Sequence, residues 1–506
     1  MTTEQAPTGQ NADATRDYDV VVIGGGPPGE NAAQYAIAGS DRTAVIIESE
    51  LVGGECSYWA CMPSKALLGP VEALAAARSL PGARERVTDG PPDLPAVLAW
   101  RDAFTSHHDD SGQVAWAQGA GIDVLRGTGR ITGPRRVRVD GPDGPVEVAA
   151  RQAVVLATGS AAAIPPVDGL AEALPWTSRD VTNVRELPRR VAVIGGGVVA
   201  CECATWLRGL GAEQVVVLER GDRLLARTEP FAGELVANGL AEAGVDVRLG
   251  TSAAAARRAG PVATGAGRIH GGAVTLDLAG PDGGRNELTV DEVVVATGRT
   301  ARADGLGLEE VGVHRDRRGF VPTDDHLTVP TPGGSAGQPW LYAVGDVTGR
   351  ALLTHMGKYQ ARIAGTVIAA RAQDLPIAGP AYRASADHGQ VPQVVFTDPQ
   401  VAAVGLTEAE ATDTGVDVET TEYDLGSVAG ASLLRDGYTG QAKLVIDRAA
   451  DVLVGATFVG PHVAELLHAA TVAIVGRVPL AQLWHAVPSY PTVSEIWLRL
   501  LESRNG

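Results

Sequence analysis

The sequence of 506 residues has no long apolar run, few cysteines and very few lysines. No uninterrupted apolar stretch of about 18 residues occurs, so no helix is expected to span a membrane. Residues 1–16 lack the basic start and apolar core of a secretion signal, and we expect them to form a disordered tail. A net charge of −18 argues against nucleic acid or an anionic membrane as the main partner. A cytoplasmic enzyme of several domains is expected.

The scarcity of lysine singles out the lysines that remain. Of 42 basic residues, only Lys65, Lys358 and Lys443 are lysine. A lysine retained in such an arginine-rich chain is a better candidate for a specific role than one of many. Lys65 is the first to consider, because it lies four residues after Cys61.

The four cysteines fall into two pairs. Cys56 and Cys61 lie in GGECSYWACMPSK, and Cys201 and Cys203 flank one residue. A structural disulfide is not expected in a cytoplasmic chain, and these spacings match zinc sites poorly, so we predict no metal site. Pro63 suits a first helical turn, which puts Cys61 near a helix N-terminus, where the dipole favours a thiolate. We interpret Cys56 and Cys61 as a redox dithiol joined by an irregular turn, and the other pair as buried inert thiols.

A dinucleotide fingerprint opens the chain. Residues 18–29 read YDVVVIGGGPPG, a β-branched run followed by Gly24, Gly26 and Gly29, and then by a helical stretch. The next apolar run ends in Glu48, 19 residues after Gly29. The three glycines are typical of a tight turn, of close backbone approach to a pyrophosphate and of close helix–strand packing, and the acid is typical of a ribose contact.

The same pattern recurs in residues 190–219. Gly195, Gly197 and Ala200 occupy the glycine positions, and Glu219 closes the second strand. Two such folds imply two dinucleotides, or one dinucleotide and its electron partner. A duplicated scaffold with one unused site is the alternative.

Three further apolar strands end in polar turns. They read VVLATGS (154–160), VVVATGR (293–299) and WLYAVGDVTG (340–349). In the last of them we expect Asp346 to reach cofactor hydroxyl groups. From about residue 390 the strands become short and alternate with turns and helices, which indicates a separate α+β domain.

Two of these segments carry a family resemblance. GGECSYWACMPSK and VPQVVFTDPQVAAVGLTE resemble the redox motif and the dimerisation-domain opening of class I pyridine nucleotide–disulfide oxidoreductases. That group contains dihydrolipoamide dehydrogenase, glutathione reductase, mercuric reductase and soluble transhydrogenase, and the likeness extends from about residue 17 onward. It implies an α/β fold with two Rossmann-like dinucleotide-binding domains, for FAD and NAD(P), and a C-terminal α+β dimerisation domain. The implied limits are 17–160 and 294–375 for the FAD-binding domain, 161–293 for the NAD(P)-binding domain and 385–506 for the dimerisation domain.

The resemblance also implies roles for individual residues. Glu48 would bind the adenosine ribose of FAD, and Lys65 would lie by the flavin and pair with Glu202. Cys61 would be the flavin-proximal, charge-transfer thiol, and Cys56 the thiol that attacks a substrate. The remaining implied contacts are Gly129, Thr158, Gly159, Ser160, Asp346, Leu352, Leu353, Thr354 and His355 for FAD, and Gly195, Gly197, Ala200 and Gly298 for the nicotinamide nucleotide.

The preferred nicotinamide nucleotide depends on the end of the second fingerprint. Glu219 would accept a hydrogen bond from a ribose 2′-hydroxyl and repel a 2′-phosphate, which favours NADH. Arg220 and Arg223 follow closely and could host that phosphate, so NADPH stays open.

The C-terminal segment departs from the family pattern. Thiol-reducing members carry a histidine five residues before a glutamate, but here Tyr490 precedes Glu495. Thiol–disulfide exchange needs a base with a pKa near 7, and such a base contributes about 10²–10⁴-fold to the rate, whereas tyrosine has a pKa near 10. His485 lies ten residues before Glu495, so it could only replace that base from another part of the turn. Mercuric reductases and soluble transhydrogenases share the tyrosine. This chain, however, lacks the C-terminal cysteine pair of the former and has both redox cysteines, unlike the latter.

These features predict a homodimeric, FAD-dependent NAD(P)H oxidoreductase with a Cys56–Cys61 redox pair. Its acceptor is expected to be a quinone, another small electrophile or a metal ion rather than a thiol disulfide. Tyr490 and Glu495 would complete the partner's site. Two alternatives remain: a disulfide reductase of the dihydrolipoamide dehydrogenase type, and a non-catalytic flavin redox sensor.

Overall fold

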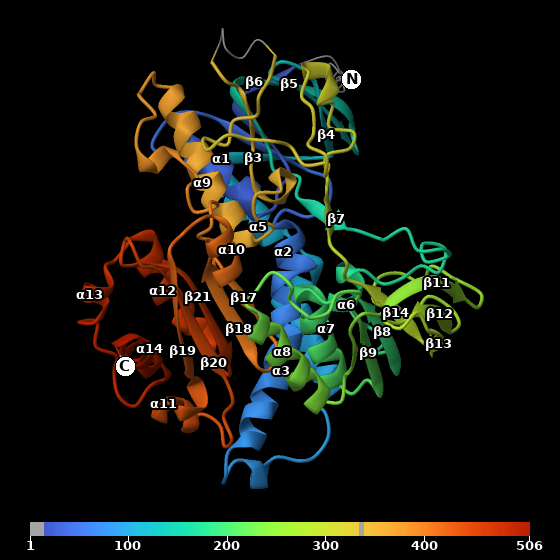
Figure 1. Cartoon of the computed structure of the whole chain (residues 1–506). Helices are drawn as coiled ribbons and strands as arrows, with labels where there is room; N and C mark the ends of the chain where they lie inside the picture. The colour runs from blue at the N-terminus through green and yellow to red at the C-terminus, as the bar shows by residue number, and fades with distance from the viewer. Residues whose placement is uncertain (1–14, 333–337, 506) are drawn as a thin grey trace, which may run out of the picture. The chain divides into compact units, whose positions relative to one another are not determined.

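The computed structural model describes residues 15–332 and 338–505, which form two compact units (Figure 1). Unit 1 contains the described residues up to 56 together with 108–161 and 300–385, and unit 2 contains 57–107, 162–299 and the chain from 386 onward. Most of the tail predicted over residues 1–16 lies outside the described residues, and Arg16 already begins the first strand. The units do not separate three domains, so the predicted domain limits stay predictions.

Unit 1 is built on one large sheet. Its main path runs in the order β3-β2-β1-β6-β5-β4, and β16 also pairs with β6. The strands β1, β2, β3 and β16 run parallel to their neighbours, because helices cross over between them, whereas β4, β5 and β6 form antiparallel hairpins. The bounds are β1 Arg16–Ile23, β2 Ala44–Glu48, β3 Ile122–Arg126, β4 Thr128–Gly133, β5 Arg136–Gly141, β6 Gly144–Leu156 and β16 Leu341–Ala343.

Two helices pack side by side against this sheet (Figure 1). They are α1 (Pro27–Ile37) and α9 (Thr354–Arg371), and α5 (Ser111–Gly119) precedes β3. The contact between α1 and α9 is close because α9 presents small residues: a Cβ added at Gly365 would lie 2.6 Å from Tyr35 Cβ. The core on this face combines valines and isoleucines of β1 and β2 with alanines of both helices. The shorter elements of the unit are η3 Glu309–Val311, η4 Gly345–Thr348 and η5 Pro380–Tyr382, while β7 Ser160–Ala162 and β15 Arg299–Ala301 lie where the chain passes between the units.

Unit 2 contains a second, smaller parallel sheet in the order β10-β9-β8-β14. Its strands read as continuous apolar runs, as expected for a parallel sheet covered on both faces. The bounds are β8 Arg190–Ile194, α7 Val198–Gly209, β9 Gln214–Leu218, α8 Pro230–Glu242, β10 Asp246–Arg248 and β14 Glu292–Val295, with an antiparallel sheet of β11 Ser252–Arg258, β12 Val274–Ala279 and β13 Arg285–Val290 inserted before the last strand.

The C-terminal part of unit 2 is an antiparallel sheet with helices. Five strands run in the order β17-β18-β21-β20-β19, and their buried side chains pack on α12 and α14. The bounds are β17 Gln393–Val395, β18 Gln400–Gly405, α10 Glu408–Asp413, β19 Val418–Asp424, η6 Leu425–Ser427, α11 Ala429–Ser432, β20 Gln441–Asp447, β21 Val452–Gly460, η7 Val463–Leu466, α12 Leu467–Val475, α13 Leu480–Leu483, η8 Val493–Glu495 and α14 Ile496–Asn505.

The long helix α3 (Cys61–Ser79) also belongs to unit 2, where Leu67 and Leu68 join the core of α7 and α8. The other elements of this stretch are η1 Arg84–Arg86, α4 Leu94–Phe104 and α6 Ser178–Thr182, while α2 Gly54–Tyr58 and η2 Ser106–His108 lie where the chain passes between the units. The predicted α/β class, with two Rossmann-like folds and a C-terminal α+β domain, is confirmed.

Candidate functional site

The first fingerprint forms the strand–turn–helix expected of a dinucleotide site. Gly24 has a φ of +107°, and a Cβ there would lie 2.3 Å from the Ala157 carbonyl oxygen, so only glycine fits this turn. A Cβ on Gly29 would lie 2.0 Å from the Gly24 carbonyl oxygen, which explains the close packing of α1. At Gly26, by contrast, the nearest atom would be 3.9 Å away. Gly26 is the N-cap of α1, so it lies where the free N–H groups of a helix would favour a bound pyrophosphate.

Glu48 ends β2 beside this turn. Its carboxylate accepts hydrogen bonds from the Gly25 and Glu50 backbone N–H groups, at 2.6 and 2.7 Å. The two bonds fix the carboxylate at the C-terminal edge of the sheet, where a ribose would lie in this fold. On the same sheet Gly129 lies in β4 against Ile23 and Ile47.

The turn after β6 and the turn after β16 meet within unit 1. Ser160 Oγ donates to Asp346 Oδ2 at 2.5 Å, and Thr158 Oγ1 donates to the Arg302 carbonyl oxygen at 2.6 Å. Gly159 between them has a φ of +74°. The predicted residues of both turns are thus brought together, with Asp346 in η4 and Leu352–His355 leading into α9.

The second fingerprint repeats this geometry in unit 2. Gly195 has a φ of +120°, and a Cβ there would lie 2.5 Å from the Ala296 carbonyl oxygen. Nothing lies within 4 Å of a Cβ added to Gly197 or to Gly298, so the backbone is accessible at both positions. Ala200 is fully buried in the third position, on α7.

Glu219 directly follows β9, close to the position that Glu48 holds at the end of β2 in unit 1. Its Oε1 accepts the Gly221 N–H at 2.6 Å. Of the two arginines that the prediction named, Arg220 is exposed and Arg223 donates to the Ala226 carbonyl oxygen at 2.9 Å. The carboxylate is therefore held at the edge of the sheet, while the Arg223 guanidinium already has a backbone partner.

The two cysteines of GGECSYWACMPSK lie on separate helices. Cys56 is in α2, which ends at Tyr58, and Cys61 begins α3; both are half-buried. The break falls at Trp59 and Ala60, as the predicted irregular turn requires. We call residues 56–61 the redox loop. At the first position of a 19-residue helix, Cys61 lies where the peptide dipoles favour negative charge.

Lys65, one turn after Cys61, forms the ion pair expected with Glu202. Its Nζ lies 2.6 Å from Glu202 Oε2, and the glutamate side chain is only 6% exposed. Glu202 Oε1 accepts the Phe396 N–H at 3.0 Å, and Lys65 Nζ lies 4.6 Å from the Phe396 ring centroid. These contacts join α3, α7 and the segment before β18 and leave the buried carboxylate fully compensated.

Cys201 and Cys203 are buried, as predicted, and their inertness stays a prediction. Both are fully buried in α7, and burial raises the pKa of Cys201 to about 12, with the charges of Glu202 and Glu219 adding to the effect. Burial also raises the pKa of Cys203 well above its usual value. A thiol that stays protonated at neutral pH is a poor nucleophile.

The C-terminal segment holds a buried acid without its expected neighbour. Glu495 is 6% exposed, and its Oε1 pairs with Arg499 at 2.6 Å. Glu495 Oε2 is buried and has no hydrogen-bond partner among the residues that the structure describes. Tyr490 is 74% exposed, and His485 is exposed beyond the end of α13. One carboxylate oxygen is thus left unsatisfied in the segment where a histidine partner is missing.

Comparison with known proteins identifies the family. The model of the family "pyridine nucleotide-disulphide oxidoreductase" matches residues 18–372, and the model of its dimerisation domain matches residues 391–500. The chain belongs to this family. Members are oxidoreductases that use FAD and a nicotinamide nucleotide, and the dimerisation domain indicates a homodimer.

Several relatives match over nearly the full chain. A dihydrolipoyl dehydrogenase of Thermus scotoductus is 33% identical over 95% of this chain and 96% of its own length. A glutathione reductase of Burkholderia cepacia is also 33% identical, over 96% and 99%. A mercuric reductase of Streptomyces lividans is 31% identical over 94% of both chains. The names of these relatives refer to three different substrates, so similarity alone does not identify the substrate of this chain.

Solved structures agree on the fold. The HOCl-induced flavoprotein disulfide reductase RclA of Escherichia coli has a TM-score of 0.79 at 22% identity, over 96% of this chain and 99% of its own. LpdA of Mycobacterium tuberculosis has a TM-score of 0.77 at 24% identity, over 97% and 99%. At this level of identity the likeness concerns the architecture.

The residues of unit 1 fit the FAD that the family uses. The N-terminus of α1 at Gly26 would receive the pyrophosphate, and the fixed carboxylate of Glu48 and the Ser160–Asp346 pair would bind hydroxyl groups at the same edge of the sheet. Among residues 15–332 and 338–505, no three or more His, Cys, Asp or Glu side chains gather as a metal site, and no helix is long and apolar enough to cross a membrane.

Several residues that hold the predicted site residues in place were not predicted from the sequence. Gln360 is fully buried on α9 and accepts the Gly345 N–H at 2.7 Å, which fixes the turn that carries Asp346. Phe396 supports the Lys65–Glu202 pair, and Arg499 shares Glu495. An arginine four residues after a glutamate in a helical segment is a recognisable signal for the last pair, but the first two need the folded chain.

Proposed function

We propose that this oxidoreductase passes electrons from a nicotinamide nucleotide to a non-thiol acceptor, such as a quinone, another small electrophile or a metal ion. The supporting observation is the unsatisfied Oε2 of buried Glu495, five residues after an exposed Tyr490. A histidine at residue 490 would give that oxygen a donor and supply a base with a pKa near 7. Without such a base, proton transfer to and from a thiol substrate is slow.

The chain's own residues divide the work in this proposal. Cys61 at the start of α3 is held where negative charge is favoured, and the Lys65–Glu202 pair places a cation one turn further along the same helix. Cys56 would be the thiol of the pair that attacks a substrate, and Cys61 the flavin-proximal thiol. When bound, FAD carries electrons between the nicotinamide nucleotide and the acceptor or the cysteine pair. A quinone or a metal ion can take these electrons without a general base.

The expected test compares acceptors in the FAD-loaded enzyme. NADH oxidation is measured with a simple quinone and with lipoamide, in the wild type and in Cys56→Ser, with Cys201→Ala as a cysteine control outside the redox loop. We expect quinone turnover to stay within about twofold of the wild type in Cys56→Ser, and lipoamide turnover to be negligible. Fast wild-type lipoamide turnover that Cys56→Ser abolishes would contradict the proposal and support a dihydrolipoamide dehydrogenase type.

The same preparation separates the enzyme from a redox sensor. An enzyme requires that NADH bleach the flavin absorbance at least as fast as the measured turnover. If bleaching is far slower than oxidant-driven modification of Cys56 and Cys61, the sensor alternative is favoured. Whether it is an enzyme or a sensor, we predict that the protein is a homodimer in the cytoplasm and has no nucleic acid or membrane partner.

NADH is the proposed nucleotide, because Glu219 is fixed at the end of β9 by the Gly221 N–H. A 2′-phosphate would meet this carboxylate, and repulsion lowers its affinity. We predict a kcat/KM at least about tenfold higher for NADH than for NADPH, and a smaller ratio in Glu219→Gln. Arg223→Ala serves as the matched control: if it abolishes NADPH use while sparing NADH, Arg223 binds the phosphate and NADPH is the physiological nucleotide.

A further inference from the structure

The short helix α6 of unit 2 contacts the redox loop. In α6, Arg179 places its guanidinium 4.2 Å from the centroid of the Trp59 ring, a cation–π distance. Trp59 lies three residues after Cys56 and two before Cys61. The side chain in the middle of the redox loop is therefore stacked on a cation from a segment more than a hundred residues away.

The same helix also holds the backbone of the loop. Thr182 Oγ1 donates to the Trp59 carbonyl oxygen at 2.9 Å, and Asn183 Nδ2 donates to the Tyr58 carbonyl oxygen at 3.4 Å. The Tyr58 and Trp59 rings meet edge to face, with centroids 5.6 Å apart. Side chain and backbone of the loop are thus fixed by Arg179, Thr182 and Asn183, which lie within little more than one helical turn.

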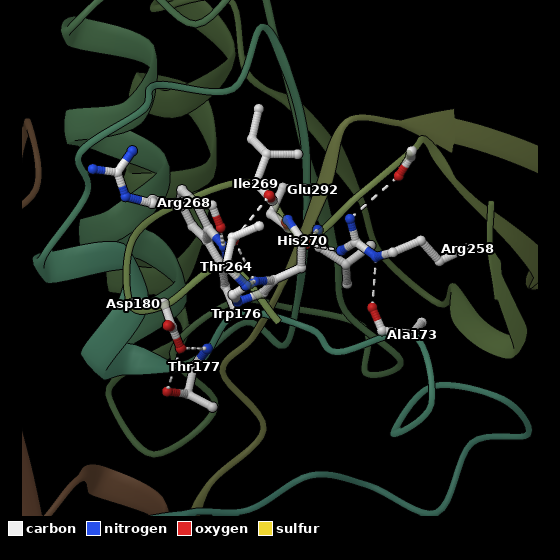
Figure 2. A network of polar contacts seen from close by, with 12 residues as sticks. Ala173, Trp176, Thr177, Asp180, Arg258, Thr264, Arg268, Ile269, His270 and Glu292 are labelled. Carbon is white, nitrogen blue, oxygen red and sulfur yellow. Dashed lines mark hydrogen bonds and ion pairs between the residues drawn. The ribbon is translucent and has the colours of Figure 1, made fainter. Parts of the chain in front are cut away.

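The N-terminal end of α6 is anchored in the nucleotide-binding fold of unit 2. Thr177 and Asp180 form a capping box, and the preceding Trp176 is fully buried. The Trp176 backbone exchanges hydrogen bonds with Val293 and Val295 of β14, as a neighbouring strand would. Its Nε1 donates to the Arg268 carbonyl oxygen at 2.9 Å, within the polar network that Figure 2 shows around Arg258 and Glu292.

The C-terminal end of α6 is anchored as well. Arg101 of α4 is fully buried, and its guanidinium donates to the carbonyl oxygens of Thr182 and Val184 at 2.8 and 3.1 Å. Asp102 neutralises the charge of Arg101 at 2.8 Å. The five-residue helix α6 is therefore fixed at both ends, and it can hold the redox loop at Tyr58 and Trp59 in one position.

We propose that Arg179 is a positioning residue for the Cys56–Cys61 pair, acting through Trp59. By stacking on the ring, it restricts the redox loop to the arrangement in which the two sulfurs can bond. Restricting the loop raises the effective concentration of one thiol at the other. In this role Arg179 acts on the two cysteines through Trp59 and the redox loop.

The role presupposes the proposed redox chemistry of Cys56 and Cys61, and one experiment tests both. The FAD-loaded enzyme is equilibrated at pH 7 with glutathione and glutathione disulfide. One S–S bond then forms between the cysteines, and two electrons and two protons pass to glutathione disulfide, which becomes two glutathione molecules. Alkylation of the remaining thiols and peptide mass spectrometry give the oxidised fraction, and hence the effective concentration of the pair.

Arg179→Ala should lower this effective concentration about three- to fivefold, the effect of losing one partly exposed cation–π contact. Arg179→Lys keeps a cation over the ring and should recover part of the loss. In a Trp59→Leu background, Arg179→Ala should change the value by less than about 1.5-fold, because the partner through which it acts is gone. The control is Arg189→Ala, at an exposed arginine that pairs with Glu213 in the same unit. This substitution should leave the effective concentration of the cysteine pair unchanged.

The outcomes are distinguishable. If the wild type forms no Cys56–Cys61 disulfide at any glutathione ratio, both the proposed redox pair and this role are wrong. If the wild type titrates normally and Arg179→Ala matches it, the redox pair stands and the positioning role fails. An equal effect of Arg179→Ala with and without Trp59 also overturns the role, because it shows that Arg179 acts by another route.

Discussion

At the scale of residues, the three lysines of this arginine-rich chain each face a glutamate. Lys65 pairs with Glu202 at 2.6 Å, and Lys443 lies 3.2 Å from Glu229. Lys358 of α9 acts on Glu30, where its positive charge opposes the effect of burial. The scarcity of lysine was therefore a useful signal, although only the pair of Lys65 was expected.

Glu30 gives a pH-dependent prediction. It follows Gly29 in the first turns of α1, and its Oε1 is buried without a hydrogen-bond partner among the described residues. Burial raises the pKa of Glu30 to about 7, against the lowering effect of Lys358. Below the pKa of the unfolded chain, near 4.5, the group is protonated in both states and costs nothing. Above it the unfolded state ionises first, so folding is penalised increasingly up to about pH 7 and constantly beyond.

Glu30→Gln removes this penalty. We expect the variant to match the wild type at pH 4.5 and to gain stability as the pH rises to 8, by at most about 3 kcal/mol. Thermal unfolding of the FAD-loaded enzyme across this pH range measures the gain, with exposed Glu309→Gln as the control. A gain that is independent of pH would mean that Glu30 is already ionised at pH 4.5 in the folded enzyme.

At the scale of elements, a buried cation connects the two halves of unit 2. Lys443 of β20 is 5% exposed and contacts Glu229, at the start of α8, and Glu408, at the start of α10. Glu229 Oε1 also accepts the Glu408 N–H at 2.7 Å. The side-chain carboxyl groups raise the pKa of Lys443 although burial opposes them. The cluster therefore holds the C-terminal sheet against a helix of the nucleotide-binding fold.

Lys443→Met should destabilise unit 2 by about 3–5 kcal/mol, because it leaves the buried Glu229 carboxylate uncompensated. Adding Glu229→Met should recover most of that loss, since both charges are then replaced by apolar groups. Arg448→Met, at an exposed arginine of the same segment, is the matched control. Urea unfolding followed by circular dichroism measures the differences. Unchanged stability of Lys443→Met would mean that the cluster contributes nothing net.

The elements also show what the sequence could and could not predict. The two strand–turn–helix fingerprints were recognisable because each lies within about 30 consecutive residues and requires glycine at fixed positions. The Lys65–Glu202 pair was expected only through the family resemblance. The Lys443–Glu229 cluster and the Arg179–Trp59 stack join residues 214 and 120 positions apart. No local period or spacing encodes such pairs, because tertiary packing creates them.

At the scale of the whole molecule, the C-terminal segment predicts how the homodimer forms. Trp484, Val487 and Tyr490 are 44%, 84% and 74% exposed, and Val472 and Val475 of α12 are 54% exposed. Exposed apolar side chains in the part of the chain matched by a dimerisation domain are expected to be covered by a second copy.

Val487→Asp should therefore weaken the dimer. Sedimentation equilibrium should show a shift from twice the chain mass of 52.1 kDa toward that mass, and NADH–quinone turnover should fall with the dimer fraction. Val262→Asp, at a 56% exposed valine of the β11–β12 connection, is the control. A monomeric Val487→Asp enzyme with full turnover would show that Tyr490 and Glu495 do not complete the partner's site.

The most direct measurement is lipoamide-dependent NADH oxidation by the FAD-loaded dimer, in the wild type, Tyr490→His and Tyr490→Phe. Tyr490→His restores the histidine five residues before Glu495 and supplies a base, so we predict negligible wild-type turnover and an increase of about tenfold or more in this variant alone. Rapid lipoamide turnover by the wild type, left unchanged by either substitution, would contradict the proposal that the missing histidine excludes thiol acceptors.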